Sequence, residues 1–423
     1  MNKPKQMLLL KEAWPLAQKI AEYLRQHEKA EQVEVAGSIR RHMETVSEIE
    51  VVIASREAED VLAFAQTMPG VTKRLHCNSH SCSVALNINI NLNIYIATPE
   101  DFSAALYFYS GSQKHIEQIR ALAKEKGFTF SEKGLYTDSG KQQIVSEKQL
   151  LSYLGLAYLE PELREGRGEL ERAANNLLPT LVTAADIKGG IHIHTSSSDG
   201  QATIAELAAK AQEIGWNYLG ISDHSQSAHY AGGLKTQQVL EQRCEIDKLN
   251  NKNPNFRILA GIESDIRLDG SLDYSDDILS QFDFVIASVH SGFKQDEQTM
   301  TKRIIKAMSN RFVSVLGHAT GRILLKRPGY KVNLPEIINA AAQTGTTIEI
   351  NSNPRRLDLD WRWHSYAQQK GVLFAINPDA HAVNELSYME AGLAVARKGG
   401  LSSADIINTR NTKEIEIALR KKR

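Results

Sequence analysis

Seven short apolar runs in the second half of the chain constrain its fold more than any other feature. They begin at residues 189, 217, 256, 282, 314, 346 and 372, and helical stretches separate them. Strands that alternate with helices form parallel sheets, because the chain must cross over before the next strand can run in the same direction. The first run, GGIHIHT, is not followed by a glycine-rich phosphate-binding turn, which disfavours a dinucleotide-binding sheet. We therefore expect a barrel.

Nearly every one of these runs ends in a histidine or an acid. Side chains two positions apart on a strand point to the same face, so His192 and His194 should project together, as should Asp379 and His381. The carboxyl ends of barrel strands meet at one rim, where such folds carry their chemistry. The candidate donors at this rim are His192, His194, Asp199, His224, Glu263, His290, His318, Asp379 and His381.

These residue types indicate a metal centre. Neutral imidazole and carboxylate suit borderline divalent ions such as zinc, manganese or ferrous iron. Six histidines and three acids exceed what one ion can use, so we expect two or three ions that share a bridging carboxylate, with Glu263 in that role. A single His224 or His318 is more often an ordinary buried polar residue. The whole set would be costly to bury without ligands, because buried polar groups need partners.

The first half has a different pattern, in which strands and helices do not alternate regularly. The expected elements are a helix over 8–30, strands over 32–37 and 48–55, a helix over 56–67 and further strands within 83–97. From residue 100 to 180 the pattern is mainly helical, and no single period persists near its end. We place the main domain boundary at about 180–187.

Several motifs of the second half resemble a known family. HIHTSSSDG, GISDHS, GIESDI, SVHSGF, LGHATGR, EINSNPRRLDL and NPDAH resemble the PHP (polymerase and histidinol phosphatase) domain, and more narrowly the C-terminal PHP domain of bacterial family X DNA polymerases. The resemblance covers about residues 186–420 and implies a distorted seven-stranded α/β barrel with a three-metal phosphoesterase centre. It also implies that His192, His194, Glu263 and Asp379 hold one ion, Glu263, His290 and His318 a second, and Asp199, His224 and His381 a third.

Phosphoester hydrolysis at such a centre also needs fixed positive charge. Metal ions lower the pKa of a water and clamp a phosphoryl oxygen, and arginine's planar fork matches the remaining oxygens. Arg355 and Arg356 follow the sixth run, and we favour Arg356 as a catalytic residue beside Glu263, with Arg355 as its solvated neighbour. Weaker candidates for lining the pocket, equally well explained as surface loop residues, are Asn353, His229 and Lys235.

The first half resembles the remainder of a family X polymerase. VEVAGSIRRHMETVSEIEVVIAS resembles the palm, with the nucleotidyltransferase turn at Gly37 and Ser38, and YFYSGSQKHIEQIRALA and LGLAYLEPELREGRGELE resemble the thumb and the segment after it. The implied fold class is α/β. The implied domains are a nucleotidyltransferase-like α+β palm with a preceding helix over 1–100, a thumb-like region and linker over 101–180, and a PHP metallophosphoesterase over 186–420.

The palm departs from the family at its catalytic carboxylates. Three aspartates of the family are matched here by Glu48, Glu50 and Asn93. Magnesium tolerates little geometric error, glutamate is one methylene longer, and asparagine carries no charge. We therefore expect templated polymerisation to be absent or very weak.

A second departure concerns DNA binding. We find no helix-hairpin-helix module before Val33, and so expect the palm to serve as a folding and docking scaffold. Nucleotide or DNA binding through Arg40, Arg41 and Lys114 is left open.

Composition bounds the partners and the compartment. Lys+Arg and Asp+Glu both number 50, so any contact with nucleic acid must be local, as at the closing RKKR. The N-terminal run of three leucines is too short for a signal sequence or a membrane span. Cys77, Cys82 and Cys244 show no CxxC spacing. This predicts a reducing compartment without a disulfide framework, by default the cytoplasm.

The leading functional hypothesis is a metal-dependent phosphoesterase that acts on DNA 3′ ends or abasic sites, as a 3′–5′ exonuclease, 3′-phosphatase or AP endonuclease. One alternative is a small-molecule phosphomonoesterase resembling histidinol phosphatase, which the zero net charge favours. Another is a non-catalytic DNA-binding scaffold with structural metals, which the number of donors disfavours. The expected partner is nucleic acid, a small phosphoester is the second choice, and no membrane partner is expected.

Overall fold

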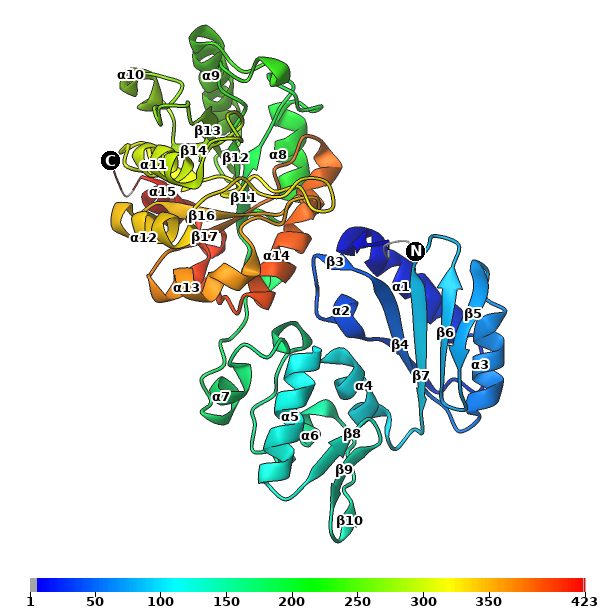
Figure 1. Cartoon of the computed structure of the whole chain (residues 1–423). Helices are drawn as coiled ribbons and strands as arrows, with labels where there is room; N and C mark the ends of the chain where they lie inside the picture. Colours follow the sequence, from blue (N-terminus) through cyan, green and yellow to red (C-terminus); the bar gives the residue numbers. More distant parts are fainter. Residues whose placement is uncertain (1–5, 421, 423) are drawn as a thin grey trace. The chain divides into compact units, whose positions relative to one another are not determined.

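The computed structural model divides into two compact units, Met1–Pro179 and Thr180–Arg423 (Figure 1). The structure describes residues 6–420 and 422. Residues 1–5, 421 and 423 lie outside the described residues and include the start of the N-terminal segment and part of the closing basic run. Within the described ranges, no helix combines the length and the apolarity that crossing a bilayer requires.

The second unit is built on one parallel sheet whose seven strands follow each other in sequence order. They are β11 (Gly189–Ile193), β12 (Tyr218–Ile221), β13 (Arg257–Asp265), β14 (Phe284–Ser288), β15 (Val313–Leu316), β16 (Thr347–Asn351) and β17 (Phe374–Asn377). A bridge between Ile193 and Ala380 joins the first strand to the segment after the last, which nearly closes the sheet. Six of the strands lie within the predicted runs and β15 begins one residue before its run, and the predicted barrel is confirmed.

Helices surround these strands (Figure 1). They are α8 (Ile204–Glu213), α9 (Thr236–Lys252), α10 (Asp276–Leu279), α11 (Glu297–Met308), α12 (Leu334–Thr344), α13 (His364–Gln369), α14 (Met389–Lys398) and α15 (Thr412–Leu419). Side-chain caps begin several of them, because Ser, Thr, Asn and Asp accept a hydrogen bond from the first unpaired amides. Thr203 caps α8 in this way and Asp296 caps α11. The helices thus begin where the loops of the rim end.

Apolar side chains fill the barrel interior below the rim. The ring of Phe284 is fully buried and lies against two glycines, Gly261 of the adjacent strand β13 and Gly220 of β12, the strand beyond it. A Cβ added to Gly261 would lie 2.2 Å from the ring, and one added to Gly220 would lie 2.9 Å from it. The glycines therefore make the space that one aromatic side chain fills.

The first unit contains a five-stranded sheet in the order β2-β4-β7-β6-β5. Its strands are β2 (Gln32–Val35), β4 (Glu48–Ala54), β7 (Asn91–Ala97), β6 (Ser81–Leu86) and β5 (Val71–Cys77), and its helices are α1 (Leu10–Leu24), α2 (Gly37–Arg40) and α3 (Ala58–Gln66). The predicted helix over 8–30 is shorter, because Leu8–Leu9 forms a strand, β1, that pairs with β3 (Thr45–Val46). Strand β5 was not predicted, because most of this edge strand is exposed and lacks apolar alternation.

A helical region with a small sheet follows in the same unit. Its elements are α4 (Phe102–Ser110), α5 (Gln113–Glu125), β8 (Thr129–Ser131), β9 (Gly134–Thr137), β10 (Gly140–Lys141), α6 (Glu147–Tyr153) and α7 (Glu169–Ala174). The buried Glu147 accepts hydrogen bonds of 2.7 Å from both Arg164 and Arg40. Burial opposes its ionisation, but Arg164 and Arg40 hold the pKa of Glu147 at about 2. This charged cluster ties the turn after β2 to the helical region.

Two of the basic residues considered for nucleic-acid binding are engaged within the chain. Arg40 bonds Glu147 as described, and Arg41 donates to Glu165 over 2.9 Å and to the carbonyl of Ser110 over 2.8 Å. Lys114 is exposed on α5. The two arginines therefore have a structural role that the sequence did not reveal, because their partners lie more than 60 residues away.

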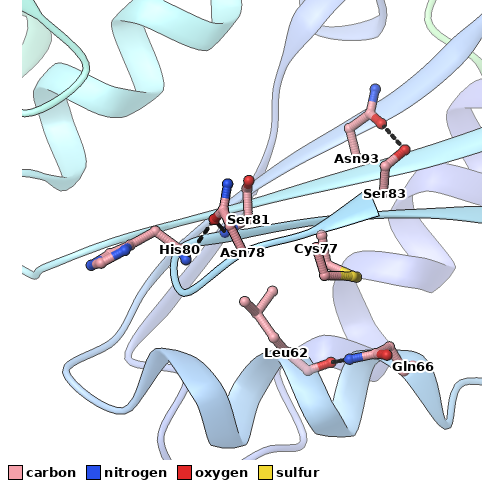
Figure 2. The surroundings of a disulfide bond; sticks show 9 residues. Leu62, Gln66, Cys77, Asn78, His80, Ser81, Ser83 and Asn93 are labelled. Atoms are coloured by element: carbon pink, nitrogen blue, oxygen red, sulfur yellow. Dashed lines mark hydrogen bonds between the residues drawn. A yellow bond between two sulfur atoms is a disulfide. The ribbon is translucent and has the colours of Figure 1, made fainter. Parts of the chain in front are cut away.

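The cysteines correct one expectation. Cys77 of β5 and Cys82 of β6 lie opposite each other in the hairpin and form a disulfide (Figure 2). In the turn between them, the Asn78 side chain accepts hydrogen bonds of 2.8 Å from the amides of His80 and Ser81. The sequence predicted no disulfide framework, and this local pair was missed because hairpin register, not spacing, brings the sulfurs together. The third cysteine, Cys244, is free and exposed.

Packing inside the barrel can be tested with a pair of substitutions. We expect Gly261→Ala to destabilise the barrel by about 1–3 kcal/mol, because overpacking a filled core forces side chains off their rotamers. In the Phe284→Leu background the same change should cost less, since the smaller side chain leaves room for the added methyl group. Urea unfolding of the two single variants and the double variant measures the coupling. Additive effects would show that the ring and the glycine do not compete for the same space.

Candidate metal centre

The carboxyl ends of the barrel strands bring all nine candidate donors together. His192 lies in β11 and Glu263 in β13, and the other seven lie in the segments that follow β11, β12, β14, β15 and β17. Glu263 is at the centre. Its two carboxylate oxygens lie 3.3 Å from His192 Nε2, 3.0 Å from His318 Nε2, 3.3 Å from His290 Nε2, 3.0 Å from His224 Nδ1 and 3.7 Å from His194 Nε2.

The two aspartates flank this arrangement. Asp379 lies 3.5 Å from His192 Nε2 and 3.3 Å from His194 Nε2. Asp199 lies 3.5 Å from His381 Nε2 and 3.7 Å from His224 Nε2. Three overlapping groups of donors have their ligand atoms within 4.8 Å of one another. They are His192/His194/Glu263, His224/Glu263/His290 and His194/Asp199/His224/His381, so His194 and His224 each belong to two groups.

The chemistry of the donor atoms fits divalent metal ions. Several of them are buried and make no hydrogen bond to any residue that the structure describes: His192 Nε2, both ring nitrogens of His194, His224 Nδ1 and Glu263 Oε2. A buried polar atom without a partner costs about 1–3 kcal/mol. Coordination to a cation would satisfy these atoms together, since imidazole nitrogen and carboxylate oxygen are ligands of the same ions.

Mutual electrostatics keeps the acids of the cluster charged. Burial opposes ionisation of Glu263, but the imidazoles of His290 and His192 hold its pKa well below the ordinary value. The pKa of Asp379 is likewise held well below its usual range, with His192 as the main cause opposing burial. His194 behaves differently, because burial and the adjoining His224 lower its pKa to about 4. Its ring is therefore neutral at physiological pH, which is the form that binds metal.

The backbone is unusual at three of the donors. His192, His318 and Asp379 have positive φ angles of 63°, 21° and 50°. Such conformations cost about 1–3 kcal/mol outside glycine and concentrate at functional sites. The pairing of β11 with β12 also shifts register between Gly190 and Ile193. Simple alternation along a strand predicted that His192 and His194 project together, and their ring centroids lie 5.3 Å apart although the strand is irregular at this point.

Two buried acids orient the histidines and were not predicted. Glu349 of β16 is fully buried and accepts hydrogen bonds from His192 Nδ1 at 2.5 Å and from the His318 amide at 2.6 Å. Asp265 contacts His290 Nδ1 at 2.6 Å. Carboxylates in this position fix the ring and its tautomer, so that Nε2 faces the centre. The signal in the sequence was a further acid in two of the runs, Glu349 within TIEIN and Asp265 two positions after Glu263, on the same side of its strand.

The remaining candidates lie at different distances from the cluster. Arg356 is partly exposed and places Nε 3.5 Å from Asp379 Oδ2. Arg355 is exposed, and its amide donates to the Asn353 side chain over 3.1 Å. His229 and Lys235 are exposed, and among the residues that the structure describes neither side chain forms a hydrogen bond or an ion pair with one of the nine donors. The structure thus brings Arg356 to the cluster and leaves the weaker candidates around it.

Comparison with known proteins gives the same assignment for both halves of the chain. The family model described as DNA polymerase beta thumb matches residues 105–165, and the model described as PHP domain matches residues 190–353. The chain is 36% identical over 410 residues to the DNA polymerase/3′-5′ exonuclease PolX of Bacillus subtilis. The match spans 96% of this chain and 72% of that protein.

Other relatives match the barrel alone. A protein named probable phosphatase from Thermoanaerobacter sp. (strain X514) is 30% identical over 249 residues, which is 55% of this chain and 94% of that protein. Another protein of that name, from Caldanaerobacter subterraneus subsp. tengcongensis, is 26% identical over 235 residues, 52% of this chain and 85% of that protein.

A nearly closed seven-stranded PHP barrel with a histidine–carboxylate cluster at its rim defines a hydrolytic phosphoesterase of a metal-dependent class. The chain belongs to the family X DNA polymerases that carry a PHP domain, since its similarity to the Bacillus subtilis protein runs through the thumb and the barrel together.

The central position of Glu263 predicts its effect on metal binding. We expect Glu263→Gln to weaken binding of Mn²⁺ or Zn²⁺ by more than about 100-fold, because changes at groups that only orient a ligand already cost about 10–100-fold. Titration calorimetry and elemental analysis of the purified protein measure this without an activity assay. A matched control is Glu213→Gln on α8, where the side chain is 69% exposed and pairs with Lys210. Equal affinity of both variants would remove Glu263 from the ligand set.

Proposed function

We propose that the barrel hydrolyses phosphoesters at DNA 3′ ends or abasic sites, as an exonuclease, 3′-phosphatase or AP endonuclease. The observation that carries the proposal is the Glu263 carboxylate surrounded by the imidazoles of five histidines. The thumb match and the exonuclease in the name of the Bacillus subtilis relative favour a nucleic-acid substrate. Such a substrate would place the enzyme in the cytoplasm, as the sequence predicts.

The nine donors would hold two or three divalent ions, of zinc, manganese or iron. Bound there, the ions supply a water of lowered pKa and polarise a phosphoryl oxygen. Glu263, which lies in two of the three donor groups, would bridge them. Glu349 and Asp265 keep the His192 and His290 rings turned toward the cluster through hydrogen bonds of 2.5 and 2.6 Å. Their role is positioning, since each acts through a histidine.

Arg356 would bind the phosphate itself. Its guanidinium lies at the edge of the cluster and is 22% exposed, so a substrate can reach it. In the free protein it faces Asp379, and a phosphoryl oxygen would take the place of that carboxylate as its partner. A planar fork can donate two hydrogen bonds to one phosphate group, and the fixed charge offsets the negative charge that builds up during attack.

A second candidate is hydrolysis of a small phosphomonoester. The relatives named probable phosphatase match the barrel over 94% and 85% of their own length. Proteins named phosphatases therefore match about half of this chain over nearly all of their own length. The formal net charge of zero supplies no general attraction for a polyanion.

A side-by-side assay separates the two substrates. With Mn²⁺ present, a labelled oligonucleotide should be shortened from its 3′ end faster than a small phosphomonoester is hydrolysed. Its rate should fall steeply with added salt, because phosphate contacts release counterions. His192→Ala and Glu263→Ala should lose at least about 100-fold of this activity. Faster hydrolysis of the phosphomonoester would favour the second candidate, and unchanged turnover in both variants would remove the metal-centred mechanism.

We further propose that the palm has lost polymerase activity. Glu50 and Asn93 lie opposite each other on β4 and β7. The Asn93 side chain donates to Glu48 over 3.2 Å and accepts from the Ser83 hydroxyl over 2.7 Å, the latter contact visible in Figure 2. The position of the third acid is therefore taken by an amide that is hydrogen-bonded within the protein, which removes one negative charge from any magnesium site.

The turn that would hold the nucleotide phosphates is also occupied. Glu50 accepts a hydrogen bond from the Ser38 backbone amide, and a Cβ added to Gly37 would meet its carboxylate at 1.7 Å. Burial, and next the neighbouring Glu48, raise the pKa of Glu50 to about 7. A carboxyl group that covers the turn takes the place that a phosphate would need.

Primer extension tests this loss directly. The protein should incorporate no labelled nucleotide above background into a gapped duplex with Mg²⁺ or Mn²⁺. The triple variant Glu48→Asp, Glu50→Asp, Asn93→Asp should raise incorporation at least about 10-fold, since it restores three short carboxylates. Extension by the unchanged protein that disappears in Glu50→Ala would contradict the proposal.

A further inference from the structure

A cavity of about 510 Å³ opens directly beside the histidine cluster. The segments after β12, β13 and β14 line it, and His290 belongs both to this lining and to the cluster. Its size falls within the range of about 300–1,000 Å³ that is usual for pockets of small organic ligands. The other lining residues that matter here are Tyr230, Asp265, Arg267 and Leu268. The cavity therefore adjoins the point at which a phosphoester would be cleaved.

Tyr230 presents an aromatic ring to this cavity. The side chain is 70% exposed, although its ring centroid lies only 6.0 Å from His224 and 6.4 Å from His290. An exposed ring contributes little to the stability of the fold, because it buries little apolar surface. The ring therefore leaves an exposed aromatic face beside two candidate metal ligands, where a bound ligand can pack against it.

The loop that carries Tyr230 is firmly held. The preceding Ser227 donates its amide to Asp273 over 2.6 Å and its hydroxyl to Asp265 over 3.0 Å. A Cβ on Gly233 would lie 1.9 Å from the Ser225 carbonyl, so the two ends of the loop are packed against each other. The ring is thus presented on a preformed support, which lowers the ordering cost of binding a ligand.

The second wall combines an exposed aliphatic side chain with charged groups of both signs, since Arg267 and Asp269 both line the cavity. Leu268 is 59% exposed at the tip of a turn that the Arg267 and Ser271 backbones close with a 2.8 Å hydrogen bond. Arg303 donates to the carbonyl of Arg267 over 2.8 Å and fixes this turn to α11. The Arg267 side chain is 56% exposed and faces Asp273. An exposed aromatic ring, an exposed aliphatic side chain and a guanidinium therefore share one cavity.

We propose that this cavity binds the base of the terminal nucleotide of a single-stranded 3′ end, stacked on Tyr230 and covered by Leu268. This inference rests on the proposed nuclease function and names its base-binding subsite. A nucleobase is flat and aromatic, and stacking on an aromatic side chain tolerates all four bases. Arg267 is placed for a phosphate of the same strand.

Two substrates test the subsite. Both are short single strands that differ only at the 3′ end, where one carries adenine and the other an abasic residue. The variants are Tyr230→Ala, Tyr230→Phe, which keeps the ring, and the control Ile417→Ala, whose side chain is 72% exposed on α15. The rates of 3′-end hydrolysis with Mn²⁺ give kcat/KM. Fluorescence anisotropy with a non-hydrolysable phosphorodithioate end gives Kd independently of cleavage.

Tyr230→Ala should lower kcat/KM and weaken binding of the adenine end by about 5- to 150-fold, the range expected for loss of one stacked base. Tyr230→Phe and Ile417→Ala should match the unchanged protein. On the abasic end all four proteins should be equal, because no base is present to stack.

The possible outcomes separate the subsite from the nuclease function. Cleavage that does not depend on Tyr230 for either end would overturn the subsite and leave the nuclease function standing. Binding that depends on Tyr230 and on the base, without any cleavage, would support the subsite and overturn the nuclease function. Absence of both binding and cleavage would overturn both.

Discussion

The attraction between one buried carboxylate and the imidazoles around it organises the whole catalytic end of this protein. Glu263 is almost completely buried, at 1% exposure, yet the histidines around it keep it ionised. A charge in such a place is tolerated only when partners surround it, since desolvation costs several kcal/mol. The barrel supplies those partners because its parallel strands deliver five histidines to the same rim. The need to surround the buried Glu263 carboxylate with partners therefore links the barrel fold to the histidine cluster.

The rest of the barrel rim can be understood as support for that interaction. Glu349 and Asp265 hold histidine rings from behind, and left-handed backbone at His192 and Asp379 turns donor side chains inward. Local strain of this kind persists only where surrounding packing enforces it. Below the rim, Phe284 against its two glycines provides such packing. Rigid interior packing and a strained, polar rim thus belong together, as is usual for barrels that carry a reaction at one end.

The acidic sites of the two halves of the chain differ in whether their donor atoms already have hydrogen-bond partners. In the barrel, buried donor atoms such as His192 Nε2 have no hydrogen-bond partner among the described residues and suit a cation. In the palm, the side chains at the corresponding functional positions bond to one another or to the backbone, as Asn93 does with Glu48. A site whose donors are already satisfied gains little from binding an ion. This contrast is the physical basis for our proposal that the palm keeps only a structural role beside the hydrolytic barrel.

The seven strands, and the meeting of the nine candidate residues at one rim, were predictable from the sequence, because period and run ends are local properties that a linear pattern displays. The residues that support the donors were not predictable, since Glu349 contacts His192 across 157 residues of sequence. The role of Tyr230 likewise follows only from its position beside His290. The pairing of Arg40 with Glu147 was hidden for the same reason, whereas the hairpin disulfide was hidden because it depends on the register of two strands. The sequence by itself determined the type of barrel and the chemistry of its rim. Only the tertiary structure decided which groups orient that rim, because contacts between distant residues depend on how the strands close.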